Sequence, residues 1–350
     1  MSLETIIVGV MVASLVLYAL LGGADYGGGV WDLFAFGRRA REQRALIADA
    51  ISPVWEANHV WLILVIVVLF TAFPPAFATI ATALHIPITL LLIGIVLRGT
   101  AFTFRTYDVQ RDDVQRRWSL VFSIASIITP ILLGDILGAI ASGTIRVENG
   151  ALTSGFFSSW LAPFPFAVGF FALALFAFLA AVYLTVEAEQ RELQRSKSQS
   201  KQRNETEPEA RQLSEDFRLR ALLAGVAVGL LALTVFLLAG SGAPTVRAGI
   251  SRTWWAVGLH LFTAIFAVSA FLTLLTRRYK LARICAAGQV TLILLGWAFA
   301  QYPNLVEPSL TITSAAAPQI TLELLLAALA AGALLLFPSY YYLIRVFKAE

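Results

Sequence analysis

Residues 51–69 read ISPVWEANHVWLILVIVVL, an apolar segment that carries Glu56, Asn58 and His59 near its start. Its length and composition predict a membrane-spanning helix. An ionised carboxylate inside a bilayer has a large desolvation cost, so an acid in such a helix indicates a function. Ser52, Glu56 and His59 are spaced by four and three residues and share one face of the helix. This polar stripe indicates proton movement or a buried polar ligand.

The whole chain has the composition of an integral membrane protein. Of its 350 residues, 58% are hydrophobic and 14% are charged, and the mean hydropathy is +0.77, whereas soluble domains average about 25% charged residues. We expect an all-α bundle and exclude a β-barrel, because nine apolar stretches each approach the ~20 residues that a spanning helix needs. The nine predicted spans cover residues 6–30, 51–72, 76–97, 118–141, 163–186, 219–240, 254–276, 283–302 and 320–344.

The distribution of basic residues predicts the orientation of the chain. All but three of the Lys and Arg residues are predicted to lie on one side of the membrane. The three on the other side are Arg146, Arg247 and Arg252. The rest of the 26 Lys and Arg residues lie in 38–50, 98–117, 187–220, 277–283 and the C-terminal end. Positively charged loops stay in the cytoplasm, so we predict an external N-terminus and a cytoplasmic C-terminus. These loops account for the net charge of +4, so nothing indicates a nucleic-acid partner.

The remaining organisation is simple. We interpret the chain as a single membrane domain, residues 1–350, with a charged cytoplasmic linker at 187–220 between spans five and six. Glu4 stands where a signal peptide would have basic residues, so we expect no signal peptide. Cys285 is the only cysteine, which rules out an internal disulfide. Tyr340, Tyr341 and Tyr342 fit an interfacial aromatic belt.

A second acid lies in the glycine-rich stretch GGADYGGG at 22–29. Asp25 is roughly 20 residues into the first span, or about 30 Å of helix rise, which places it in the same half of the membrane as Glu56. The glycines allow close helix approach or leave room for water beside the carboxylate. Helix packing with an interfacial aspartate is the alternative. Asp32 is interpreted as a solvated edge residue.

Two arginines and a third acid complete the polar residues near the spans. Arg98 and Arg105 end the third span. Arg98 is placed to be a counter-ion of Asp25 or Glu56, and an arginine that extends to the interface is an equal alternative. Asp135, in the fourth span, either extends a proton path or caps a kink at Pro130.

Three histidines raise the question of haem. His59 is predicted in the cytoplasmic half of the membrane, His85 near its middle and His260 in its outer half. A bis-histidine haem needs two ligands at similar depth, so we do not expect this chain to ligate haem, and we favour satisfied or proton-relaying histidines. The sequence has no phosphate-binding loop, metal-ligand pair or nucleophile elbow.

Three stretches, in their order and spacing, resemble subunit II of the cytochrome bd quinol oxidases. They are GGADYGGGVWDLF at 22–34, ISPVWEANHVWLI at 51–63 and LRGTAFTFR at 97–105. The resemblance is most specific in the first 105 residues and rests mainly on topology beyond them. Where a frequent family form has Trp-Asp-Gly-Asn-Gln, this chain has Glu56 for the aspartate and His59 for the glutamine.

The resemblance implies a non-haem subunit, not catalytic alone, of a respiratory-chain oxidase in a bacterial-type plasma membrane. That oxidase reduces oxygen to water with electrons from quinol. The b-type haems and haem d are expected in subunit I, which packs against this chain's two four-helix bundles and one peripheral helix. The resemblance associates Glu56 with a cytoplasmic proton-uptake route and Trp61 with the oxygen route. It leaves open a structural quinone or lipid in this chain and a small single-span third subunit.

On this hypothesis the proton pathway consists of Glu56, Asp25, His59 and Ser52. Polar support comes from Arg98, Asn58 and Arg105, and a dry wall for oxygen or quinone comes from Trp55 and Trp61. The alternative is a proton-coupled secondary transporter that uses Asp25 and Glu56. No internal repeat is visible, which counts against a transporter. A purely structural anchor for an oxidase is a third hypothesis.

Overall fold

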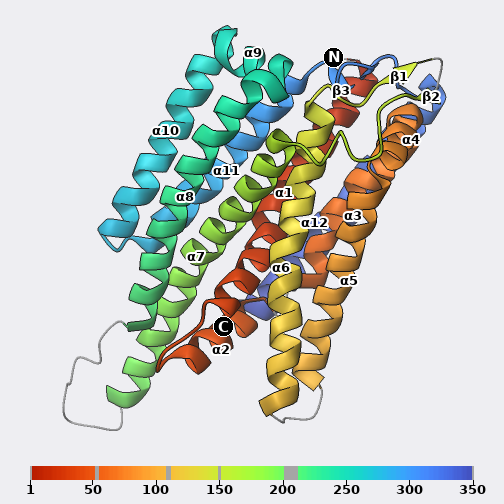
Figure 1. Ribbon diagram of the computed structural model, residues 1–350. Helices are drawn as coiled ribbons and strands as arrows, with labels where there is room; N and C mark the ends of the chain where they lie inside the picture. The colour runs from red at the N-terminus through yellow and green to blue at the C-terminus, as the bar shows by residue number, and fades with distance from the viewer. Residues whose placement is uncertain (1, 52–54, 108–111, 149–150, 201–211, 349–350) are drawn as a thin grey trace.

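The computed structural model describes residues 2–51, 55–107, 112–148, 151–200 and 212–348, which form an almost entirely helical protein (Figure 1). The helices of these residues are α1 (Leu3–Leu33), α2 (Ala40–Ile51), α3 (Trp55–Ala72), α4 (Pro74–Ala83), α5 (His85–Tyr107), α6 (Asp112–Ala141), α7 (Pro163–Ser200), α8 (Gln212–Gly242), α9 (Pro244–Arg252), α10 (Trp254–Leu275), α11 (Tyr279–Gln301) and α12 (Gln319–Lys348). Two antiparallel strand pairs are β1 (Val147–Glu148) with β2 (Ala151–Leu152) and β3 (Asn304–Val306) with β4 (Leu310–Thr311).

The chain is a multi-pass membrane protein by the length and hydropathy of its helices. Among the described residues, eight helices are long and apolar enough to cross a membrane, and a ninth span results if α2 and α3 count as one span bent by 53°. Seven of the nine predicted spans coincide with single helices of this set, and two differ. The predicted span 51–72 corresponds to α3, which counts as a span only together with α2. The predicted span 76–97 is divided at Leu84 into α4 and α5, and Pro87, which has no backbone N–H to continue a helix from α4, lies in the first turn of α5.

The most buried of the spanning helices are α1, α6 and α7. In Figure 1, α1 and α7 lie between α8–α11 on one side and α5–α6 on the other. Helix α1 packs against α3, α6 and α7, and α7 packs against α6 and α8. The largest buried cluster includes Tyr18 and Tyr26 of α1 with Phe176 and Phe178 of α7. By contrast, α10 and α12 are the least buried of the spanning helices.

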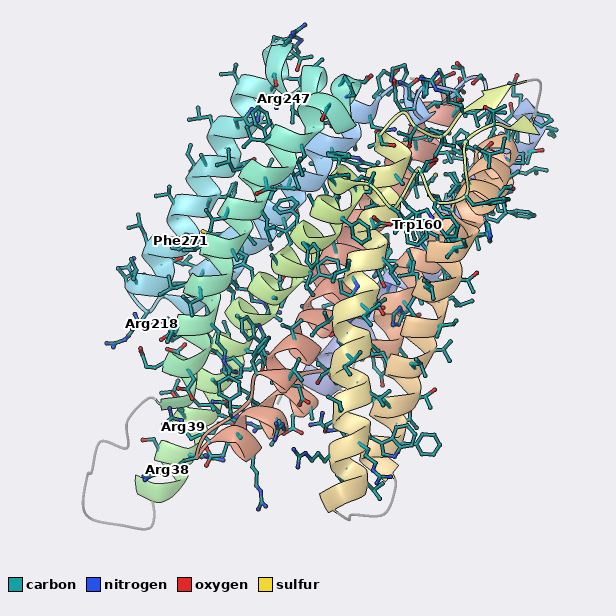
Figure 2. All side chains as sticks on the ribbon, in the orientation of Figure 1. Arg38, Arg39, Trp160, Arg218, Arg247 and Phe271 are labelled. Atoms are coloured by element: carbon teal, nitrogen blue, oxygen red, sulfur yellow. The ribbon has the colours of Figure 1, made fainter. Side chains whose placement is uncertain are left out.

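One end of the molecule is strongly basic. Figure 2 shows Arg38, Arg39 and Arg218 at this end, which we call the basic end, and Arg247 at the opposite end. Within the predicted linker 187–220, α7 continues to Ser200 and α8 begins at Gln212. The linker is thus helical over much of its length, while residues 201–211 lie outside the described residues.

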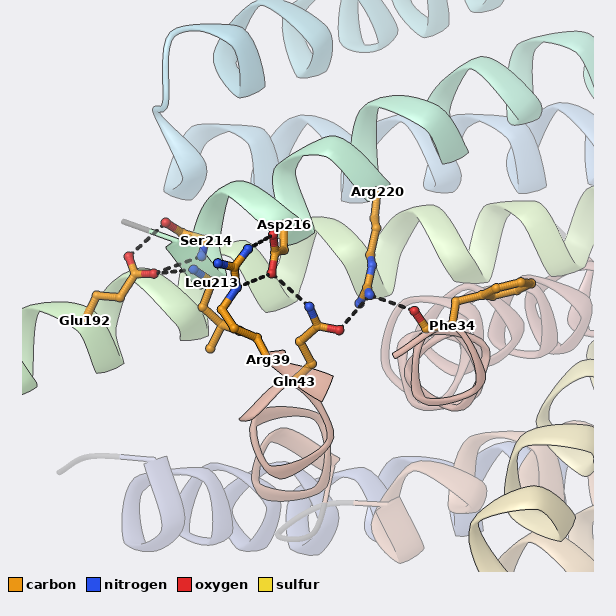
Figure 3. Close-up of polar contacts among 8 residues, drawn as sticks. All are labelled: Phe34, Arg39, Gln43, Glu192, Leu213, Ser214, Asp216 and Arg220. Atoms are coloured by element: carbon orange, nitrogen blue, oxygen red, sulfur yellow. Dashed lines mark hydrogen bonds and ion pairs between the residues drawn. The ribbon is translucent and has the colours of Figure 1, made fainter. Parts of the chain in front are cut away.

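Helix α2 lies along the basic end and is held there by polar contacts (Figure 3). It buries Gln43, Leu46, Ile47 and Ile51, which form one stripe of an amphipathic helix. Arg39 donates two hydrogen bonds to the Asp216 carboxylate at 2.6 and 2.9 Å, and these bonds raise the pKa of the arginine.

Four further hydrogen bonds join α2 and α7 to α8. Gln43 donates to Asp216 at 2.8 Å and accepts from Arg220 at 2.7 Å. Glu192 of α7 accepts the backbone N–H groups of Leu213 and Ser214, which caps the start of α8. These hydrogen bonds hold α2 against α8 and α7 against the start of α8.

Candidate functional site

Asp25 and Asn58 form the centre of a buried polar site. Asp25 lies on α1 and is 6% exposed, and the Asn58 side chain on α3 donates from Nδ2 to its Oδ2 at 2.6 Å. The Tyr340 hydroxyl on α12 donates to Asn58 Oδ1 at 3.0 Å. Both ends of the Asn58 amide are therefore used, and three helices meet at one carboxyl group. A hydrogen bond to a charged group typically contributes about 1.5–3 kcal/mol.

The glycines around Asp25 explain how α1 reaches this position. A Cβ atom on Gly27 would overlap the carbonyl oxygen of Phe176, and one on Gly29 would overlap the Ser126 side chain. The absent side chains thus let α1 approach α7 on one face and α6 on another. The cluster therefore provides the close packing that we considered as one of its two roles.

Arg98 lies in a pocket of aromatic rings beside α1. It is 2% exposed, so it is not an arginine that extends to the interface. Its Nε donates to Ser126 Oγ at 3.2 Å, and its guanidinium lies 4.6 Å above the Tyr26 ring and 5.2 Å from Phe122. Its Nη2 has no hydrogen-bond partner among the described residues. Arg98 thus places a buried positive charge on the α1 face that carries Tyr26.

Two tyrosines and His59 extend the site along α1. The Tyr18 hydroxyl donates to the Tyr26 hydroxyl at 3.2 Å, and both side chains are buried. The His59 ring is half-buried, with its centroid 6.0 Å from that of Tyr18 and 6.2 Å from that of Tyr26. Tyr18 is seven residues from Asp25, so helical periodicity could have placed both on one face. Neither tyrosine was among the residues predicted for the site.

Arg105 and Asp32 form a separate buried ion pair. Arg105 Nη1 is 3.0 Å from Asp32 Oδ1, and Ser123 Oγ donates to Asp32 Oδ2 at 3.3 Å. The interpretation of Asp32 as a solvated edge residue was wrong, because the side chain is 1% exposed. Arg105 supplies the counter-charge from α5. The pair joins α1 to α5, and the Ser123 hydroxyl joins α6 to it.

Glu56 is exposed on the surface of this chain, in the first turn of α3. Asn58, two residues on, is buried and turned toward Asp25. Ser52 lies outside the described residues, and so does the side chain of Trp55. Trp61 is buried, and its ring centroid is 6.2 Å from that of Tyr340. The structure therefore groups Asp25, Asn58, His59 and Trp61 around α1 and α12, with Glu56 on the outside.

A cavity of about 150 Å³ lies beside the Asp25 carboxyl group. Its walls come from α1, α2, α3, α7, α11 and α12. The polar and charged side chains that line it are Asp25, Asn58, Tyr183, Glu187, Arg283 and Tyr340. Tyr340 was interpreted only as part of an aromatic belt, and no local pattern in the sequence indicates its contact with Asn58, which is 282 residues away.

The remaining sites predicted from the sequence stay apart from this group. Asp135 is 1% exposed, neither of its oxygens has a hydrogen-bond partner among the described residues, and α6 continues as a helix through Pro130. His85 and His260 are exposed, and they belong to α5 and α10, which lie at opposite sides of Figure 1. This separation does not fit a bis-histidine haem. Within the described residues, no three His, Cys, Asp or Glu side chains could hold a metal ion together.

Comparisons with known proteins point to one family. A family model described as cytochrome bd terminal oxidase subunit II matches residues 3–347. A putative cytochrome bd menaquinol oxidase subunit II of Bacillus subtilis is 20% identical over 95% of this chain and 92% of its own. The cytochrome bd-I ubiquinol oxidase subunit 2 of Escherichia coli is 28% identical over 51% of this chain and 46% of its own.

A solved structure shares the fold. A chain of the bd oxidase from Geobacillus thermodenitrificans superimposes with a TM-score of 0.77 over 100% of both chains, at 22% identity. The architecture described above is therefore that of a known membrane protein fold.

Proposed function

This chain belongs to the cytochrome bd terminal oxidase subunit II family, and from that membership we propose that it supports a haem-bearing subunit I and supplies part of its proton-uptake route. Chains of this family are homologues of subunit II of the cytochrome bd quinol oxidases, which are terminal oxidases. The complex would reduce oxygen to water with electrons from quinol. Reduction of oxygen to water consumes protons, so the reaction centre needs a supply of them.

The observation that carries this proposal is the hydrogen-bonded group of Asp25, Asn58 and Tyr340 inside the bundle. A buried carboxyl group with side-chain partners and an adjacent cavity is suited to accept and release protons. Glu56 is exposed on the same chain, two residues from Asn58. In the proposed route Asp25 takes up protons and Glu56 passes them across the surface of this chain to subunit I.

The neighbouring residues set the environment of that route. Arg98 gives a positive charge beside the Tyr26 ring of α1. His59 lies against the Tyr18 and Tyr26 rings, where it would hold water or relay a proton. Arg105 supports the site through its ion pair with Asp32. Trp61, with Trp55, provides a dry wall for oxygen or quinone.

The cofactors belong to the partner in this proposal. The b-type haems and haem d would be held by subunit I, as the resemblance to the family implies. Quinol oxidation would also take place there. A structural quinone or lipid in this chain and a small single-span subunit are further components that the purified complex can reveal.

We propose a bacterial-type plasma membrane location with nine spans, arranged as two four-helix bundles and one peripheral helix. The basic end, with Arg38, Arg39 and Arg218, would face the cytoplasm. This orientation puts Asp25, in the last third of α1, nearer to the cytoplasm than to the outside. The family match does not favour the proton-coupled transporter.

Gentle purification of the tagged chain from its native membrane tests this proposal. The preparation should contain a larger haem-bearing polypeptide, and its reduced-minus-oxidised spectrum should show a haem d band. A colourless chain that is stable alone in detergent would contradict the oxidase proposal and would call for proton-coupled transport assays.

A further inference from the structure

The cavity beside Asp25 extends from the buried site toward the basic end. On α1 it is lined by Leu20, Leu21, Ala24, Asp25 and Gly28, and on α7 by Ala180, Tyr183, Leu184 and Glu187. The α7 residues are spaced by three, one and three positions and therefore form a single face of that helix. Both helices turn one continuous face toward the same space.

The relative depth of Asp25 and Glu187 follows from the packing of α1 on α7. Gly27 of α1 lies against Phe176 and Ala180 of α7. Glu187 is seven residues beyond Ala180 on a helix that continues toward the basic end, which corresponds to about 10 Å of rise. The two carboxyl groups are therefore at different depths, with Asp25 deeper and Glu187 nearer to the basic end.

The wall near Glu187 also carries a positive charge. Arg283, in the second turn of α11, has its guanidinium 4.7 Å from the centre of the Tyr183 ring. Tyr183 is one helical turn before Glu187, so the two side chains are neighbours on α7. Glu187 and Arg283 are both half-buried and both line the cavity. This part of the cavity wall thus carries a carboxyl group and a guanidinium group. Leu20 and Leu21 contribute apolar groups to the wall.

From this arrangement we infer that the cavity is a water-filled entry chamber, in which Glu187 takes protons from the cytoplasm and cavity water carries them to Asp25. A volume of about 150 Å³ has room for several water molecules, each of which occupies about 30 Å³ in the liquid. Six polar or charged side chains on its wall can hold that water. In each transfer a proton leaves a hydronium ion for the Glu187 carboxylate and then moves through water to the Asp25 carboxylate.

Arg283 and Tyr183 are positioning residues in this chamber. The guanidinium, held over the Tyr183 ring, keeps a positive charge on the cavity wall near Glu187. The Tyr183 ring holds the guanidinium in place. The inference rests on the proposed proton role of Asp25 and adds the residues through which protons reach it.

Cysteine accessibility tests the chamber independently of turnover. Cys285 is first replaced by Ala, and Ala24→Cys is introduced in the cavity wall. Silver ions are added to inside-out or right-side-out vesicles, and the free thiol of this chain is then labelled with a maleimide after denaturation. We expect silver to block labelling of Ala24→Cys only in inside-out vesicles. The matched control Ala19→Cys, which is 4% exposed and outside the cavity, should be labelled in both.

The Glu187 carboxyl group is tested by turnover of the complete oxidase. Glu187→Gln should lower oxygen reduction by at least about threefold, more strongly at high pH where hydronium is scarce, with the haem content unchanged. Glu187→Asp should keep most of the rate. Glu189→Gln, on the same helix but outside the cavity, should leave the rate and its pH profile as they are.

The outcomes separate this inference from the proposed function. The entry-chamber inference is wrong if Ala24→Cys is labelled in both vesicle types after silver treatment, as it would be with a resident lipid or quinone in the cavity. It is also wrong if Glu187→Gln has an unchanged pH profile. If silver blocks labelling of Ala24→Cys in inside-out vesicles but Asp25→Asn has full turnover, the cavity holds water and the proposed proton role of Asp25 is wrong.

Discussion

The side-chain amide of Asn58 joins Asp25 to Tyr340. It donates to Asp25 Oδ2 at 2.6 Å and accepts from the Tyr340 hydroxyl at 3.0 Å. An amide cannot gain or lose a proton near neutral pH, so Asn58 orients its neighbours and does not itself titrate. The position of the Asp25 carboxyl group therefore depends on two helices, α3 and α12, that follow it in the chain.

Replacement of Asn58 tests this dependence. Asn58→Ala removes the hydrogen bond to a buried carboxyl group, so we expect a loss of about 1–3 kcal/mol of stability and slower oxygen reduction. Tyr340→Phe removes only the second bond and should cost less. Thermal unfolding and oxygen consumption of the purified complex measure both effects. A fully active and equally stable Asn58→Ala complex would show that Asn58 does not position Asp25.

Glu56 is exposed on this chain, and we expect it to act where the partner subunit packs. Glu56→Gln should slow oxygen reduction by on the order of tenfold or more, because a proton acceptor is lost. The haem spectrum and the subunit ratio should stay the same, and Glu56→Asp should keep most of the rate. Loss of haem in Glu56→Gln would indicate a structural role for the acid instead.

The Arg105–Asp32 pair should contribute to stability. Arg105→Ala leaves a buried carboxylate without its counter-charge, which typically costs about 3–5 kcal/mol. The matched control is Arg39→Ala, since the exposed Arg39–Asp216 pair should contribute about 1 kcal/mol or less. Thermal unfolding of the purified complexes compares the two variants. Equal losses in both would contradict the burial argument.

Gly27 and Gly9 lie on the same helix in different surroundings. A Cβ atom on Gly27 would overlap the Phe176 carbonyl oxygen, whereas one on Gly9 would meet nothing within 4 Å. Gly27→Ala should therefore separate α1 from α7 and reduce the yield of folded complex. Gly9→Ala should be neutral or stabilise the helix by up to about 1 kcal/mol. Normal yield and melting temperature for Gly27→Ala would show that the packing is looser than described.

The sequence predicted those parts of the protein that depend on local patterns. Apolar length indicated the spanning helices, and the glycine cluster indicated close helix approach or room for water around Asp25. The interpretation of Asp32 failed because its counter-ion, Arg105, is 73 residues away. The contact between Tyr340 and Asn58 could not be read from the sequence for the same reason. The packing of the helices determines which distant side chains come into contact, and no local sequence pattern indicates it.

The burial of Glu56 also could not be predicted from local sequence. Spacing placed Ser52, Glu56 and His59 on one face of a helix. Spacing alone does not determine which face of the helix packs inside the protein. The structure has Asn58 buried against Asp25 and Glu56 exposed. The roles of these residues in proton uptake stay predictions that the variants above address.

Proton uptake by Asp25→Asn in the purified oxidase, with this chain and its partner reconstituted in vesicles, tests the central claim most directly. The variant keeps the size of the side chain and removes its ionisable proton. We predict that oxygen reduction and proton uptake at the basic end fall together by on the order of tenfold or more, with haem content unchanged. The exposed Asp49→Asn, paired with Arg191, should match the unmodified complex. Full turnover and full proton uptake in Asp25→Asn would contradict the account.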